Sequence, residues 1–111
     1  MTVFVVETYV VKPDKLSEFG AFVKNFEMFM KKRPELFTEQ KSHKLFSQMF
    51  GGNWGGGVWM TEADSLADVE KGFSKLMGDK EFMTKLMAEW NALIVPGTYS
   101  INVWTPVQGT T

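Results

Sequence analysis

Val3–Phe19 (VFVVETYVVKPDKLSEF) opens the chain and decides its fold. Successive side chains of a β-strand point to opposite faces, so the strand part of this stretch divides into two sets. Neither set is typical of a face exposed to water, because both are largely apolar. We therefore predict a strand over 3–12 that is covered on both faces. One set is Phe4, Val6, Thr8 and Val10, and the other is Val3, Val5, Glu7, Tyr9 and Val11.

A helix is predicted directly after this strand. Pro13 suits a first helical turn, where its missing N–H is not needed. Apolar residues then recur at steps of three and four as far as about Lys32, namely Leu16, Phe19, Val23, Phe26 and Met30. The helices of a small domain can cover one face of its sheet. In so short a chain we expect a second copy of the chain to cover the other face.

The rest of the chain continues the pattern of strands and helices. Glycine-rich Gly51–Gly57 is predicted to join two strands as a hairpin, Ser65 to start a helix, and Gly78 to break it. The order β-α-β-β-α-β predicts a ferredoxin-like α+β fold, with a four-stranded antiparallel sheet and helices on one face. Two such sheets meeting face to face would form a dimeric α+β barrel. The further predicted elements are strands over 42–50, 58–62 and 98–105 and helices over 65–77 and 80–93.

Length and composition favour one domain, spanning residues 1–111. The formal net charge is −1, so the chain has no excess of basic residues to neutralise phosphates, and we do not expect nucleic acid as a partner. The absence of cysteine excludes disulfides and thiolate metal sites, and a single histidine argues against a transition-metal site. No signal peptide or membrane span is predicted, and we expect the protein in the cytoplasm.

The chain is rich in large, adaptable side chains, with 10 Phe, 4 Trp, 2 Tyr and 8 Met. An ordinary core uses the same residues, and that is the simpler interpretation. So much aromatic bulk would crowd a single small core, however. The surplus favours an aromatic interface, an apolar ligand cavity, or both.

Two motifs are distinctive: Glu7–Phe19 (ETYVVKPDKLSEF), a strand-to-helix junction, and Trp59–Asp68 (WMTEADSLAD), an aromatic strand that runs into a Ser-Leu-Ala helix start. Both resemble the NIPSNAP-like branch of the dimeric α+β barrel superfamily. The resemblance implies a homodimer with a cleft between helices and barrel. The superfamily includes cofactor-free monooxygenases, haem-binding enzymes and transcriptional effector domains, so the resemblance leaves the chemistry open.

Glu7 and His43 are the candidate catalytic residues. Glu7 lies in a largely apolar strand, and a carboxylate in such surroundings often has a shifted pKa. His43 is the sole imidazole, so it could act as a base near neutral pH if Glu7 or a similar group oriented it. Each has a structural alternative. Glu7 could hold a polar network at a dimer interface, and His43 could be a surface histidine.

Candidate ligand-binding residues are aromatic or carry an amide. Tyr9 projects to the same side as Glu7 and could donate a hydrogen bond to an oxyanion. Packing is the alternative role for the tryptophans, and a flexible hairpin is the alternative for the loop around Trp54. The full set is Tyr9, Trp59, Asn102, Trp104 and Trp54.

These observations predict a homodimer that binds a hydrophobic small molecule, such as a fatty-acid-like, isoprenoid or polyketide-like compound, with no cofactor. The alternative is a cofactor-independent monooxygenase or isomerase that acts on such a compound. A third possibility is an interaction module whose dimer surface is its whole function. A perturbed carboxylate that faces a cavity would favour catalysis.

Overall fold

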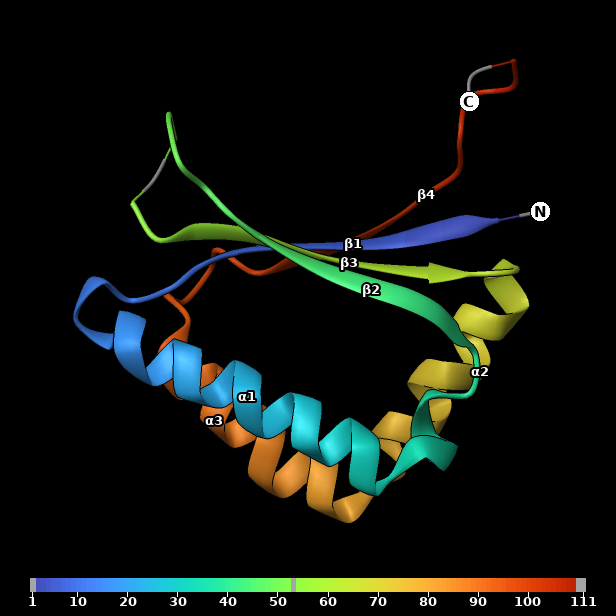
Figure 1. Cartoon of the computed structure of the whole chain (residues 1–111), viewed down its shortest axis with the longest axis horizontal. Helices are drawn as coiled ribbons and strands as arrows, with labels where there is room; N and C mark the ends of the chain where they lie inside the picture. The colour runs from blue at the N-terminus through green and yellow to red at the C-terminus, as the bar shows by residue number, and fades with distance from the viewer. Residues whose placement is uncertain (1, 53, 110–111) are drawn as a thin grey trace.

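A computed structural model describes residues 2–52 and 54–109 (Figure 1). Four strands form one antiparallel sheet in the order β2-β3-β1-β4. Strand β1 therefore lies in the middle, between β3 and the edge strand β4. The strands are β1 Val3–Val10, β2 Gln40–Ser47, β3 Gly56–Ala63 and β4 Ser100–Trp104; the helices are η1 Pro13–Lys15, α1 Leu16–Lys32, η2 Pro34–Phe37, α2 Leu66–Met77, η3 Phe82–Leu86 and α3 Met87–Leu93.

This arrangement confirms the predicted ferredoxin-like order and the antiparallel sheet. Ser65 caps α2 as predicted, because its side chain accepts a hydrogen bond from the Asp68 N–H at 3.1 Å. The boundaries differ by a few residues. The second strand starts two residues earlier than predicted and ends three earlier.

The helices cover one face of the sheet, here called the inner face (Figure 1). Side chains from β1 and β3 meet α1, η2 and α3 there in a core dominated by aromatic rings. The rings pack edge to face, as the 4.8 Å between the centroids of Phe26 and Trp59 and the 4.9 Å between those of Tyr9 and Trp90 show. This core fixes the positions of α1 and α3 against the strands.

The opposite, outer face of the sheet has no helix over it (Figure 1). All five residues of β4 are exposed in the single chain. Trp104 is 55% exposed and Phe46 47%. The outer face therefore presents large apolar side chains that this chain does not cover itself.

Candidate functional site

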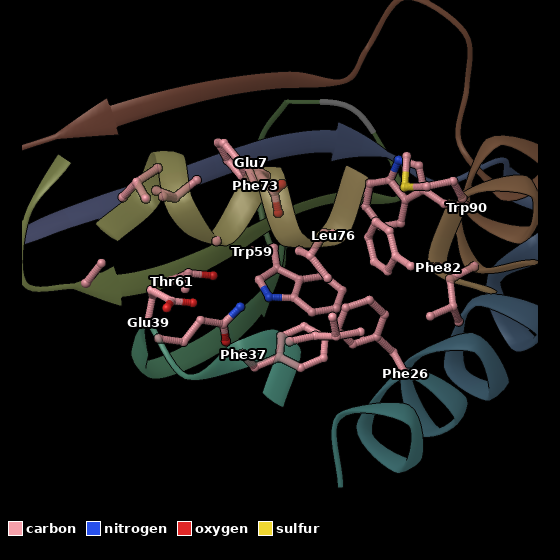
Figure 2. A pocket seen from close by; sticks show the side chains of 18 of the residues that line it. Glu7, Phe26, Phe37, Glu39, Trp59, Thr61, Phe73, Leu76, Phe82 and Trp90 are labelled. Atoms are coloured by element: carbon pink, nitrogen blue, oxygen red, sulfur yellow. The ribbon is translucent and has the colours of Figure 1, made fainter. Parts of the chain in front are cut away.

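A cavity of about 120 Å³ lies between the inner face of the sheet and the helices (Figure 2). Its walls are mostly aromatic and come from every layer of the fold. Six polar or ionisable residues interrupt this lining, and they are the groups that could select a ligand. The main aromatic residues are Phe26, Phe37, Trp59, Phe82 and Trp90, and the polar residues are Glu7, Glu39, Gln40, Thr61, Asp68 and Tyr99.

Glu7 enters this cavity from the central strand. The alternation that placed Glu7 with Val5 and Tyr9 holds, so its carboxylate points toward the helices rather than toward the outer face. Burial raises the pKa of Glu7 above its ordinary value of 4.5, and a hydrogen bond from a tyrosine partly offsets that rise. Glu7 is thus a carboxylate held ready to take up a proton inside an apolar cavity.

Tyr99 is the tyrosine that donates a hydrogen bond to Glu7. Its hydroxyl donates to Glu7 Oε1 at 2.7 Å, and its ring lies edge-on to Trp90 with 5.4 Å between centroids. β4 pairs with β1 so that Ile101 is opposite Glu7, which leaves Tyr99 diagonal to the carboxylate on the same face. Burial, followed by the nearby Glu7 charge, raises the pKa of Tyr99, so the phenol stays protonated and remains a donor.

A second polar group of residues, here called the Glu39 end, consists of Glu39, Gln40 and Thr61. In Figure 2, Glu39 and Thr61 lie together at one end of the cavity, with Trp59 between them and the rings of Phe26 and Phe82. Sequence reasoning missed Glu39 because it follows the short η2 turn in a segment predicted only as a connection. The apolar pair Leu36 and Phe37 was the one signal that this connection packs against the core.

Glu39 is held as an anion by Lys75 of α2. Lys75 Nζ lies 2.9 Å from Glu39 Oε2, and this hydrogen bond is the main reason that the pKa of Glu39 falls below its ordinary value. Lys75 also donates to Thr38 Oγ1 at 2.8 Å and to the Glu35 carbonyl at 3.2 Å. An ammonium group has three N–H donors, so Lys75 has none left for the other Glu39 oxygen.

Two irregular features shape the helical wall of the cavity. The predicted helix over 80–93 contains a π-helical turn, Phe82–Leu86, near its start. The first and last residues of this turn, Phe82 and Leu86, line the cavity. Such wide turns often occur at functional sites. Gly72 of α2 also lines the cavity, and a Cβ placed there would lie 4.0 Å from Glu39 Oε1. The missing side chain leaves space beside that oxygen.

Of the predicted ligand-binding residues, Trp59 lines the cavity and Tyr9 does not. Tyr9 is buried in the core, where its ring packs on Trp90. It pairs with Gly57 of β3, and a Cβ at Gly57 would lie 2.8 Å from the Tyr9 ring. Burial, followed by the Glu7 charge, raises the pKa of Tyr9 to about 12. The tyrosine that contacts Glu7 is Tyr99, which donates a hydrogen bond to its carboxylate.

His43 lies on the inner side of β2 but is oriented by a different carboxylate from the one predicted. Its Nε2 is 2.7 Å from Glu27 Oε1 of α1, so the imidazole links the edge strand to that helix. Its ring centroid is 6.3 Å from that of Trp59, and His43 does not line the cavity. The structure thus separates the two predicted catalytic residues.

Asn102, Trp104 and Trp54 do not meet the cavity either. Asn102 is opposite Val6 and Trp104 opposite Phe4, which puts both on the outer face of the sheet. Trp54 is 76% exposed in the loop between β2 and β3. The prediction grouped Asn102 and Trp104 with Trp59, but the alternation of β4 sends Tyr99 and Ile101 inward instead.

Comparison with known proteins supports the fold. No protein-family model and no curated protein matches this sequence. Among solved structures, a NIPSNAP family protein from Agrobacterium tumefaciens superposes with a TM-score of 0.76 at 15% identity, covering 99% of this chain and 97% of the other. A putative antibiotic biosynthesis monooxygenase from Caulobacter crescentus gives 0.69 at 17% identity, over 96% and 91% of the two chains.

A third solved structure has the same fold. A protein from Bacteroides fragilis, described as dimeric, of unknown function and ferredoxin-like in fold, gives a TM-score of 0.62 at 12% identity, covering 93% of this chain and 94% of the other. The resemblance to the NIPSNAP-like branch is thereby confirmed at the level of the fold. Structural similarity at such low identities shows the fold but not the activity, so the activity must be argued from the chemistry of the cavity.

Proposed function

We propose that this protein binds a compact, ring-containing small molecule in the inner-face cavity and works as a homodimer. The observation that carries the proposal is an aromatic cavity with an ionisable group, Glu7, in its wall. Specific small-molecule sites typically have this composition, an apolar lining with a few convergent polar groups. Of the compound classes expected from the sequence, a polyketide-like ring compound suits the cavity best.

Size and wall chemistry both support a ring over an extended chain. The cavity of about 120 Å³ approaches the roughly 150 Å³ of an engineered protein cavity that accepts benzene. Aromatic walls favour an aromatic guest, because rings attract one another edge to face beyond the gain from burying area. A longer ligand would have to extend out of the cavity.

The four tryptophans allow a direct test of binding. Benzofuran, a compact ring compound, is titrated into ¹⁵N-labelled protein while the indole N–H signals are followed by NMR. We expect the Trp59 and Trp90 signals to shift and the Trp104 signal to stay still, because only the first two line the cavity. A fragment of this size should bind with a Kd of about a millimolar or below. Shifts confined to Trp104, or none at all, would contradict the proposal.

A second function, a cofactor-independent isomerase or monooxygenase, is favoured by one specific observation: the raised pKa of Glu7 inside the cavity. Glu7 would remove a proton from an acidic C–H of the ligand, while Tyr99 holds the carboxylate in place. An isomerase would return the proton to a different carbon. A monooxygenase would let the carbanion react with O₂, turning a CH₂ into C=O with loss of one water.

Deuterium exchange tests this base directly. The probe is 2-indanone in D₂O, whose acidic CH₂ protons exchange when a base removes them, and O₂ uptake is recorded in the same sample. We expect Glu7→Gln to slow the catalysed exchange about 100-fold or more, because a general base contributes that much. Glu70→Gln is the matched control and should leave the rate nearly unchanged, because Glu70 is exposed on α2 and does not line the cavity. An equal rate in Glu7→Gln and the unaltered protein would exclude Glu7 as the base.

The proposed homodimer uses the outer face of the sheet. Its exposed Trp104 and Phe46 would be buried if two sheets met face to face, as in a dimeric α+β barrel. Trp104→Glu should give a monomer in analytical ultracentrifugation, and a dimer of unchanged affinity would contradict this arrangement.

The single domain over 1–111 and the cytoplasmic location stay predictions. Among the described residues, no helix is long and apolar enough to cross a membrane.

A further inference from the structure

The Glu39 end of the cavity holds a buried charged oxygen without a partner. Glu39 Oε1 makes no hydrogen bond to any described residue, and the side chain is only 10% exposed. The other oxygen, Oε2, takes the Lys75 hydrogen bond. A buried acceptor without a donor costs free energy, and a charged one costs more than a neutral one.

Among the described residues, neither of the two lysines beside Glu39 donates a hydrogen bond to this oxygen. The three N–H groups of Lys75 donate to Glu39 Oε2, to Thr38 Oγ1 and to the Glu35 carbonyl. Lys71 is 66% exposed, and its Nζ lies 3.7 Å from Oε2, beyond hydrogen-bond distance. Oε1 lies instead beside the space left by Gly72, in the wall of the cavity.

We infer that the ligand carries an N–H or O–H hydrogen-bond donor that binds Glu39 Oε1. This inference rests on the proposed binding function and adds a requirement to it. Gln40 Oε1 is likewise buried without a donor, and it belongs to the same end of the cavity. A half-turn of the Gln40 amide can present a donor or an acceptor. Glu39 is ionised and can only accept, so it determines which group of the ligand binds there.

The donor is a different group from the one that meets Glu7. Strand β3 lies between β2 and β1, so Gln40 and Val3 are both level with Ala63, and Glu39 directly precedes Gln40. Glu7 is four residues further along β1 than Val3. The backbone of Glu7 is therefore offset from that of Gln40 by about 13 Å along the strands and about 10 Å across them. A compact ring cannot reach across this offset, so the donor that binds Glu39 Oε1 is not the group that meets Glu7.

Indole and benzofuran form a matched pair of probes, since they have the same shape and differ in an N–H donor against an oxygen. Each is titrated into the protein by NMR. We expect indole to bind about tenfold to a hundredfold more tightly, the range for a hydrogen bond to a charged group. In Glu39→Gln the ratio should fall to about one or below, because Lys75 holds the new amide oxygen and the NH₂ faces the ligand. Glu7→Gln, the control, should keep the preference.

Gly72→Ala gives a second measurement that leaves the Lys75–Glu39 pair intact. Its methyl group occupies the space beside Oε1, so the indole preference should fall several-fold, whereas Gly20→Ala in α1 should change nothing. Equal binding of the two probes to the unaltered protein, or a preference that survives in Glu39→Gln, would overturn the inference while the binding function stands. Failure of both probes to bind would overturn the proposed function and the inference together.

Discussion

Two of the three carboxylates that line the cavity, those of Glu7 and Glu39, have pKa values shifted in opposite directions. Burial raises the pKa of Glu7, and the Tyr99 hydroxyl only partly offsets it. The Lys75 hydrogen bond lowers the pKa of Glu39 despite the burial that acts against it. The opposite shifts have different leading causes, which are burial for Glu7 and the hydrogen bond from the Lys75 ammonium for Glu39.

The largest expected effect comes from removing that cation. Lys75→Met should lower the free energy of unfolding by about 1–3 kcal/mol, because the Glu39 charge then stays buried without its main partner. Lys71→Met is the matched control and should change the free energy by less than about 0.5 kcal/mol, since Lys71 is 66% exposed. Urea denaturation measures both. Equal losses of unfolding free energy in the two variants would show that Lys75 is not what holds Glu39 as an anion.

The two acids should also give opposite pH dependences of stability. Folding raises the pKa of Glu7, so the protonated form favours the folded state below the ordinary value of 4.5, and that benefit is lost as the pH rises through the folded pKa. Folding lowers the pKa of Glu39, so its ionised form stabilises the protein at pH values above the ordinary pKa of 4.5. This stabilisation is lost as the pH falls through the pKa of Glu39 in the folded protein.

Neutral isosteres make this prediction measurable by thermal melting. Glu7→Gln should raise the Tm at pH 8. At pH 4 it should leave the Tm nearly unchanged, because Glu7 and the glutamine that replaces it are both neutral there. Glu39→Gln should lower the Tm at pH 8 and lose this effect toward low pH. A Tm difference for Glu7→Gln that is the same at both pH values would contradict the raised pKa.

A smaller effect is expected at the Glu7–Tyr99 hydrogen bond. Tyr99→Phe removes the donor, so it should raise the Glu7 pKa further and cost about 0.5–1.5 kcal/mol of stability. Tyr9→Phe, the control, leaves that hydrogen bond in place and should have no comparable effect on the Glu7 pKa. Carboxyl NMR of the two variants distinguishes them. The same pKa change in both would mean that Tyr99 has no special role.

The smallest effect is expected at Gly72. Alanine disfavours the unfolded chain relative to glycine, so Gly72→Ala and Gly20→Ala should each stabilise the protein by about 0.4–1 kcal/mol. A Cβ at Gly72 would meet its nearest neighbour at 3.9 Å, and one at Gly20 would meet nothing within 4 Å. Destabilisation by Gly72→Ala alone in urea denaturation would show that there is no free space beside Glu39.

The sequence predicted the fold well because the deciding signals are local. Alternation in 3–12 and the apolar spacing after Pro13 each depend on near neighbours in the chain, and both lead to the observed elements. The π-helical turn at Phe82–Leu86 was not predicted, because its apolar spacing is close to that of an α-helix.

The cavity was predicted only in part, because its polar groups depend on register. Alternation put Glu7 on the same side as Tyr9, but it could not show that β4 pairs with β1 so as to bring Tyr99 to Glu7. The same missing register placed Asn102 and Trp104 with Trp59. Glu39 owes its position to the turn at η2 and its charge to Lys75, which lies 36 residues away in the sequence.

One measurement tests the contrast between the two acids most directly. Carboxyl ¹³C signals of glutamate-labelled protein, assigned with Glu7→Gln and Glu39→Gln, are followed across a pH titration. The account predicts that Glu7 titrates above the ordinary value of 4.5 and Glu39 below it, in the same sample. Glu7 titrating at or below that value would contradict the account, because the cavity would then hold no carboxylate ready to take up a proton.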